Sequence, residues 1–198
     1  MNGEEKEIKL VLGMDEHELL SDYFSKYSTF LKELKQRNIY LDSSDRQLTS
    51  KSEMFRIRVT EQTIQITHKY DLDSQDGFFQ CSQREKEFER VPFADITELV
   101  TNLPLEDFYP HLPSSLEVIG EMENRRMVYL WKNFTIELDT TKMPDSTTEF
   151  ELECETETPD RFQAVIKEVF DEIGITMKFQ TQTKYARFLE KLDCLEST

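Results

Sequence analysis

Hydrophobic and polar residues alternate with a period of two along several separate segments of the chain, which is typical of β-strands. In an extended strand from about Glu4 to Leu12, three ionic side chains would share one face and three apolar side chains the other. The ionic set is Glu5, Glu7 and Lys9, and the apolar set is Ile8, Leu10 and Leu12. The same pattern predicts further strands at 38–42, 55–60, 64–70, 85–91, 116–123, 126–131, 134–141 and 147–155.

Apolar residues at helical spacing predict helices between these strands. The first would run from about Asp15 to about Gln36, and a short one would lie between Pro92 and Pro104. A third would begin after Thr158 and end at Gly174, and a last one would include residues 185–192. The acidic segment 71–82 is predicted to be a loop.

The ionic faces of these strands carry charges of both signs. Arginine and lysine mark the strands at 55–60, 64–70 and 126–131, whereas carboxylates mark those at 85–91, 134–141 and 147–155. One interpretation is an antiparallel sheet with a solvated, salt-bridged face and helices on its dry face. The other is a closed barrel whose charged face lines the interior, and about eight strands suffice to close a barrel around a small ligand.

Composition narrows the functional classes. The chain has 198 residues, consistent with a single domain over 1–198, and 40 acidic against 24 basic residues give it a net charge of −16. This excess of acid disfavours binding to a nucleic acid duplex. No apolar run approaches the ~20 residues that span a bilayer.

The cysteine and histidine residues indicate which cellular compartment and which type of metal site are compatible with the sequence. Three widely spaced cysteines without a CxxC motif favour a reducing, cytoplasmic compartment. Three scattered histidines argue against a His-rich metal site, so any metal should be oxygen-bound. Carboxylates from different strands could hold Mg²⁺ or Mn²⁺, while arginine and lysine could bind phosphate oxygens.

Short motifs along the chain resemble, in order, those of the CYTH superfamily, the triphosphate tunnel metalloenzymes. The segment Glu5-Lys6-Glu7-Ile8-Lys9 resembles the family's ExExK signature. The later matches are Gln36-Arg37-Asn38-Ile39-Tyr40-Leu41-Asp42, Phe55-Arg56-Ile57-Arg58, Thr67-His68-Lys69, Arg84-Glu85-Lys86-Glu87-Phe88-Glu89, Arg126-Met127-Val128-Tyr129, Glu137-Leu138-Asp139, Phe150-Glu151-Leu152-Glu153 and Thr183-Lys184-Tyr185-Ala186-Arg187-Phe188. The run from Glu151 to Arg161 resembles plant-type inorganic tripolyphosphatases of this family.

The resemblance implies an α+β fold: an eight-stranded antiparallel β-barrel, or tunnel, with a charged interior and helices packed outside. It implies that the metal ligands or water-positioning carboxylates are Glu5, Glu7, Asp139, Glu151 and Glu153. It implies that the phosphate-binding cations are Lys9, Arg56, Arg58, Lys69, Arg126 and Lys184. The residues assigned to catalysis are Lys9, Glu151 and Glu153, with Lys9 orienting or deprotonating the attacking water. Either Glu85 or Glu87 could reach the same site.

The expected activity is metal-dependent hydrolysis of a triphosphate by water attack on the terminal phosphoryl group. The predicted inward positions beside the arginines hold Met54 and Thr60, with no aromatic residue to stack on a base or on thiamine. Inorganic tripolyphosphate is therefore the favoured small-molecule substrate, ahead of thiamine or nucleoside triphosphate. A class IV adenylate cyclase and a non-catalytic polyphosphate or nucleotide-binding module are the alternatives, and both a monomer and a homodimer are compatible with the sequence.

Overall fold

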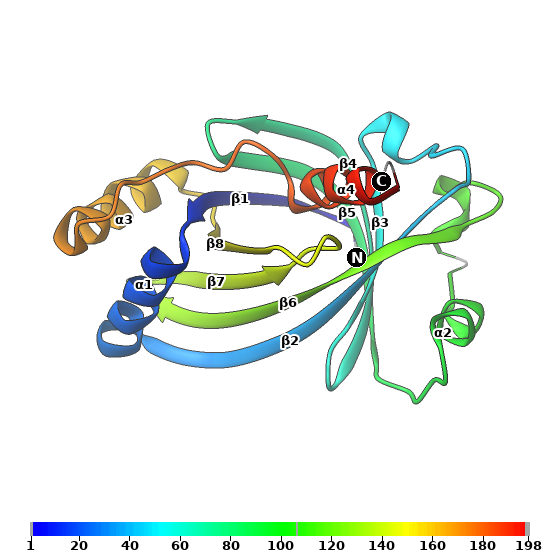
Figure 1. Ribbon diagram of the computed structural model, residues 1–198, viewed down its shortest axis with the longest axis horizontal. Coiled ribbons are helices and arrows are strands. Elements are labelled where there is room, and N and C mark those ends of the chain that lie inside the picture. Colours follow the sequence, from blue (N-terminus) through cyan, green and yellow to red (C-terminus); the bar gives the residue numbers. More distant parts are fainter. Residues whose placement is uncertain (1, 106, 197–198) are drawn as a thin grey trace.

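The chain forms a closed antiparallel β-barrel with helices on its outside (Figure 1). The structure is a computed structural model that describes residues 2–105 and 107–196. The strands are β1 (Asn2–Leu12), β2 (Thr29–Asp42), β3 (Met54–Val59), β4 (Thr63–Gln75), β5 (Phe78–Glu89), β6 (Glu117–Trp131), β7 (Phe134–Lys142) and β8 (Thr148–Glu155). Around the barrel they follow the order β1-β5-β4-β3-β2-β6-β7-β8, which confirms the barrel and not the open sheet.

The apolar strand faces point outward and are covered by helices. Figure 1 shows α1 (Met14–Tyr27) and α3 (Pro159–Ile173) together at one end of the molecule and α2 (Ile96–Asn102) at the other. The first pair packs on β1, β6, β7 and β8 through a cluster that includes Leu20, Phe24 and Phe162. A second cluster packs α2 on β2, β3 and β4. The barrel interior is therefore lined mostly by polar and ionic side chains.

The last helix, α4 (Lys184–Glu196), lies across the barrel (Figure 1). Phe188 of this helix is completely buried against Tyr40, Met54 and Met122 of the strands. Gly120 allows the close approach, because a Cβ atom there would lie 2.8 Å from the Phe188 ring. Its φ of +156° also accompanies a bulge in the pairing of β6 with β2.

Two tight hairpins show how local sequence sets the strand register. Lys132 and Asn133 both have positive φ and join β6 to β7, as the sequence predicts. Asp76 and Gly77 make the same kind of turn between β4 and β5, so the loop predicted for 71–82 is wrong. The Asp-Gly pair is a strong hairpin signal, which the acidic character of the segment hid.

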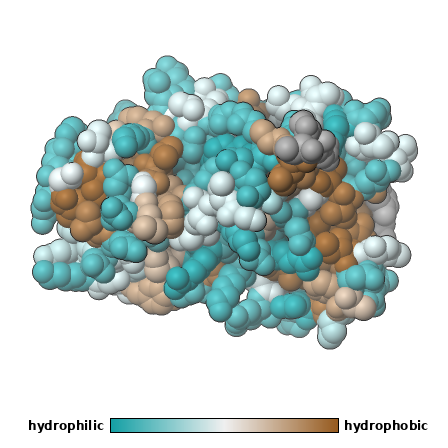
Figure 2. Space-filling view, viewed as in Figure 1, coloured by the Kyte–Doolittle hydropathy of each residue, from teal (hydrophilic) through white to brown (hydrophobic). Residues whose placement is uncertain are grey.

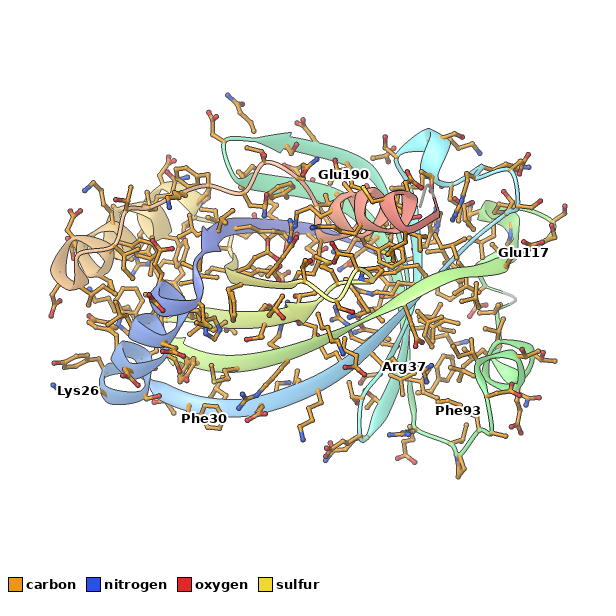
Figure 3. All side chains as sticks on the ribbon, viewed as in Figure 1. Lys26, Phe30, Arg37, Phe93, Glu117 and Glu190 are labelled. Carbon is orange, nitrogen blue, oxygen red and sulfur yellow. The ribbon has the colours of Figure 1, made fainter. Side chains whose placement is uncertain are left out.

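The helix predicted for 15–36 ends about nine residues early, at Tyr27 in the structure. The following residues belong to β2, which pairs with β6 from Thr29 onward and absorbs the short strand predicted at 38–42. Phe30 and Leu31 have helical spacing but are 54% and 49% exposed. Figure 3 shows Phe30 pointing away from the barrel, so its spacing carries no information about a buried helix face.

The remaining elements lie close to their predicted positions. The strands predicted at 116–123 and 126–131 are one continuous strand, β6, bent at its bulge. The other predicted helices are confirmed as α2, α3 and α4, and Gly174 ends α3 with φ +75°. Within the described ranges, no helix combines the length and the apolar character needed to cross a bilayer. Figure 2 shows hydrophilic residues over the middle of the visible face and apolar patches toward its ends.

Candidate active site inside the barrel

The barrel encloses a cavity of about 340 Å³ whose wall is strongly ionic. The carboxylates that line it are Glu5, Glu7, Glu85, Glu137, Glu153 and Glu155. The cations that line it are Lys9, Arg56, Arg58, Lys69, Arg126 and Lys184. A volume near the lower end of the ~300–1,000 Å³ range is suited to a small ligand. Equal numbers of the two signs make the lining close to neutral by itself.

Lys9 lies at the point where three carboxylates converge. Its Nζ is 2.9 Å from Glu7 and 3.0 Å from Glu153, and it belongs to the buried part of β1. Burial lowers the pKa of Lys9, but the charges of Glu153, Glu7 and Glu151 outweigh this effect and raise it well above the ordinary value. The Lys9 ammonium is therefore protonated at neutral pH, and it can donate hydrogen bonds but cannot accept a proton.

Arg126 of β6 binds carboxylates of the next two strands around the barrel, β7 and β8. Its Nε and Nη2 donate to Asp139 at 2.7 and 2.6 Å, Nη2 also donates to Glu153 at 2.5 Å, and Nη1 donates to Glu137. The Asp139 side chain is completely buried. Burial alone would raise the pKa of Asp139, but Arg126 and Lys184 lower it to about 2. These contacts fix one side of the cavity through β6, β7 and β8.

Arg56 and Arg58 contrast with Arg126, because neither forms an ion pair with any residue that the structure describes. Arg58 donates from Nε to the Asn38 side chain at 2.8 Å, and Arg56 reaches only Thr67 Oγ1, at 3.4 Å. Burial, together with the like charges of Arg56 and Arg126, lowers the pKa of Arg58 to about 9. Among the described residues, this wall of the cavity therefore presents positive charge without a directly bonded carboxylate, which favours an anionic ligand.

The predicted site residues are mostly brought together. Nine of the eleven line the cavity, and the two exceptions are Asp139 and Glu151. Both exceptions are buried behind the wall, where Lys184 Nζ lies 2.5 Å from Asp139 and 3.3 Å from Glu151. Of the two β5 candidates, Glu85 lines the cavity, whereas Glu87 is exposed and is not part of the lining.

Sequence reasoning missed other lining residues. Glu137 lies in the cavity wall, although the motif around it had directed attention to Asp139 two residues later. Tyr40 and Tyr185 also line the cavity, so the expectation of no aromatic residue there is wrong. Their rings contact each other with centroids 4.9 Å apart, and both contact the Phe188 ring, which is stacked on Tyr185. Alternation within single strands could not reveal Tyr185, because it lies on α4.

The lining has the chemistry that Mg²⁺ or Mn²⁺ requires, namely several carboxylate oxygens from different strands. In the described residues, no three acidic, histidine or cysteine side chains converge closely enough to hold a metal ion as they stand. Lysine and arginine side chains form ion pairs with these carboxylate oxygens instead, as Lys69 does with Glu5. The carboxylates fit a divalent cation if the amino groups turn to an anion that enters with it.

Comparison with known proteins gives the family and its structural relatives. The family model described as the CYTH domain matches residues 3–189. The Hippeastrum protein HpAC1, studied as an adenylyl cyclase and found to have a dominant triphosphatase activity, is 25% identical in sequence. That structure matches with a TM-score of 0.78, over 94% of this chain and 95% of HpAC1. No curated protein matches the sequence significantly.

Two more distant structures share the fold. An adenylate cyclase candidate from Bacillus halodurans is 19% identical, with a TM-score of 0.66 over 94% of this chain and 98% of its own. The PH1819 protein from Pyrococcus horikoshii is 18% identical, with a TM-score of 0.62 over 94% and 99% of the two chains. Because the family match spans nearly the whole sequence and the strands close around an ionic tunnel, this chain belongs to the CYTH domain family.

Proposed function

We propose that this protein hydrolyses inorganic tripolyphosphate, with a divalent cation, by water attack on the terminal phosphoryl group inside the barrel. The observation that carries the proposal is the wall of β3, where two adjacent inward arginines, Arg56 and Arg58, have no carboxylate partner among the described residues. An unneutralised guanidinium pair is a favourable site for phosphate oxygens, which each arginine can bind with two donors. The triphosphatase activity found for HpAC1 supports the same reaction class.

Charge balance supports the requirement for a divalent cation. The lining carries six carboxylates and six cations, so it is close to neutral before any ligand enters. A triphosphate adds several negative charges to a buried space, and isolated charges are strongly disfavoured there. Divalent cations entering with the substrate would restore neutrality. When bound, the cation polarises a phosphoryl oxygen and activates water.

The side chains on the wall have separable tasks in this proposal. Arg56, Arg58 and Lys69 hold the phosphate chain on the β3 and β4 side. Glu5 and Glu7 of β1, with the carboxylates of β7 and β8, would hold the divalent cation. Lys9 stays protonated between Glu7 and Glu153 and donates hydrogen bonds that orient water or a phosphate oxygen.

The aromatic residues at the cavity are compatible with a substrate that lacks an organic group. Tyr40 and Tyr185 pack on each other and on Phe188, so their ring faces are in use within the protein. The Tyr185 hydroxyl lies 3.0 Å from Thr49 Oγ1, within hydrogen-bond distance. A base or thiamine ring would have to displace these contacts in order to stack. Tripolyphosphate has no ring and can bind without displacing these contacts.

The test is phosphate release from tripolyphosphate, thiamine triphosphate and ATP with Mg²⁺ or Mn²⁺, together with an assay for cyclic AMP. We expect the highest kcat/KM with tripolyphosphate. Lys9→Ala and Arg56→Ala should each lose most of this activity. Lys6→Ala is the matched control for Lys9→Ala, because Lys6 lies beside it in β1 but pairs at the surface with Glu157.

Each alternative has its own outcome in this assay. Cyclic AMP formation that exceeds phosphate release would identify a cyclase. Tight binding without any turnover would identify a binding module. Full activity in both Lys9→Ala and Arg56→Ala would show that the reaction does not take place in this cavity.

A further inference from the structure

A short segment between α3 and α4 is attached to the barrel beside Lys9. Val11 N donates to the carbonyl oxygen of Lys178 at 2.9 Å, and Gln180 N donates to the carbonyl oxygen of Lys9 at 3.0 Å. On the same edge of β1, Lys9 N donates to the carbonyl oxygen of Gly77 at 2.9 Å. The segment thus extends the pairing of β1 at the place where β5 turns away, and it brings the Gln180 side chain to the barrel wall.

Gln180 is 7% exposed, and its side-chain amide has partners on both atoms. Its Oε1 accepts from the backbone N–H groups of Thr181 at 2.9 Å and Gln182 at 3.2 Å. Its Nε2 donates to Glu151 Oε1 at 3.1 Å. The turn that precedes α4 therefore holds the amide in one orientation, with its donor directed at a carboxylate that is 1% exposed.

Glu151 in turn binds the start of α4. Its Oε2 lies 3.3 Å from Lys184 Nζ and 2.8 Å from Arg187 Nη2. Lys184 is the first residue of α4, and Thr183 caps the helix by accepting from Ala186 N at 3.1 Å. A positive charge at a helix N-terminus opposes the helix dipole, so the Lys184 ammonium depends on the carboxylates around it.

We propose that Gln180 is a positioning residue for the phosphate-binding cation Lys184: by fixing the Glu151 carboxylate, it acts together with Asp139 and Glu153 to hold the Lys184 ammonium at the cavity wall. The inference rests on the function proposed above, since it assigns Gln180 a task in binding the same substrate. Replacing a side chain that orients a metal ligand commonly lowers metal affinity or activity about 10–100-fold, and we expect an effect of similar size at Gln180 because Glu151 is an expected metal ligand. No motif in the sequence marks Gln180, because its partner lies 29 residues away.

The test uses Gln180→Glu, which keeps an oxygen acceptor for Thr181 and Gln182 but replaces the donor with an oxygen facing Glu151. The matched control is Gln182→Glu, which adds the same charge two residues away, where the side chain is bonded to the exposed Glu190. Tripolyphosphate binding is measured calorimetrically in EDTA, and kcat and KM are measured with Mg²⁺. We expect Gln180→Glu to weaken binding and raise KM by about 10–100-fold, with a much smaller change in kcat.

A role confined to holding the turn predicts the opposite result. In that case Gln180→Glu would bind tripolyphosphate as the Gln182→Glu control does, and the inference would be overturned. If Gln180→Glu does not fold, Gln180→Met, which has similar length and no charge but removes both the donor and the acceptor, is compared with Gln182→Met in the same two assays. A wild type that binds tripolyphosphate but releases no phosphate removes the proposed hydrolysis, and the EDTA measurement still decides the role of Gln180.

Discussion

Replacing Arg58 by glutamine should make the unliganded protein more stable while weakening its binding of tripolyphosphate. Arg58 is a half-buried cation near two other arginines, and no carboxylate among the described residues forms an ion pair with it. Glutamine places an N–H donor close to the position of the arginine Nε, so it can keep the hydrogen bond to Asn38, which spans 2.8 Å. The substitution therefore removes the charge without leaving the buried Asn38 oxygen unpaired.

The magnitude follows from the pKa of Arg58, which falls from 12.5 to about 9 in the folded protein. The native state disfavours the charged form of Arg58, so this charge lowers the stability of the wild-type protein. The destabilisation is fully present below pH 9 and disappears only as the pH rises toward 12.5. Each pKa unit corresponds to about 1.4 kcal/mol, which gives an upper bound of about 5 kcal/mol. Relaxation and water entry reduce this, and we expect a gain of about 1–3 kcal/mol.

Thermal unfolding at neutral pH, with and without tripolyphosphate and Mg²⁺, measures both effects. For a chain of this length, 1 kcal/mol corresponds to about 2–4 °C in Tm. Arg58→Gln should raise the Tm of the unliganded protein and lose most of the increase that the ligand produces. Arg126→Gln should instead lower the free energy of unfolding by about 3–5 kcal/mol, because buried Asp139 and Glu153 each lose one of their cationic partners.

Arg37→Gln is the matched control at the surface. Arg37 pairs with Glu121 at 2.6 Å, with both side chains well exposed, so its removal should change stability by only about 0–1 kcal/mol. A decrease in the Tm of unliganded Arg58→Gln comparable to that of Arg126→Gln would refute the reasoning, since it would mean that Arg58 is stabilised by the folded protein. An undiminished response to ligand would refute its assignment to phosphate binding.

Two further predictions concern acid and metal. Burial would raise the pKa of Glu5, but Lys69 lowers it to about 2, so this pair stabilises the fold above pH 4.5 and the contribution is lost as pH falls toward 2. Lys69→Met should therefore move the acid unfolding midpoint, followed by circular dichroism, to higher pH, and an unchanged midpoint would contradict the pairing. Removing divalent cations with EDTA should abolish phosphate release, and Mg²⁺ should increase the Tm shift caused by tripolyphosphate; equal shifts with and without Mg²⁺ would contradict the charge-balance argument.

Much of the barrel could be predicted from alternation because its strands separate ionic from apolar residues cleanly. In β8, Glu151 and Glu153 face inward while Phe150 and Leu152 face the helices, and the sequence alone indicates both faces. The first half of β2 could not be predicted this way, since Phe30 and Leu31 are exposed, with the Phe30 ring packed against Tyr129 at the surface. There the pairing with β6 decides the structure, and a single segment of sequence does not contain its partner.

The site was predictable where its residues belong to short inward-facing motifs and not where the fold brings distant segments together. Arg56 and Arg58 follow from one strand, whereas Gln180 reaches Glu151 only because residues 178–180 pair with β1. Tyr185 reaches the cavity only because α4 lies across the barrel. These contacts depend on tertiary placement, so no local periodicity could have indicated them.

The different environments of Arg126 and Arg58 explain how the same tunnel can be stable and still bind a polyanion. Arg126 is neutralised by three carboxylates and holds β6, β7 and β8 together, so its charge contributes to the fold. Among the described residues Arg58 has no such partner, and its charge destabilises the unliganded protein. An anion that binds Arg58 removes this electrostatic penalty in the bound state. The free energy recovered in this way adds to the affinity for the ligand. Ligand affinity and the stability of the unliganded protein should therefore change in opposite directions at Arg58 and in the same direction at Arg126.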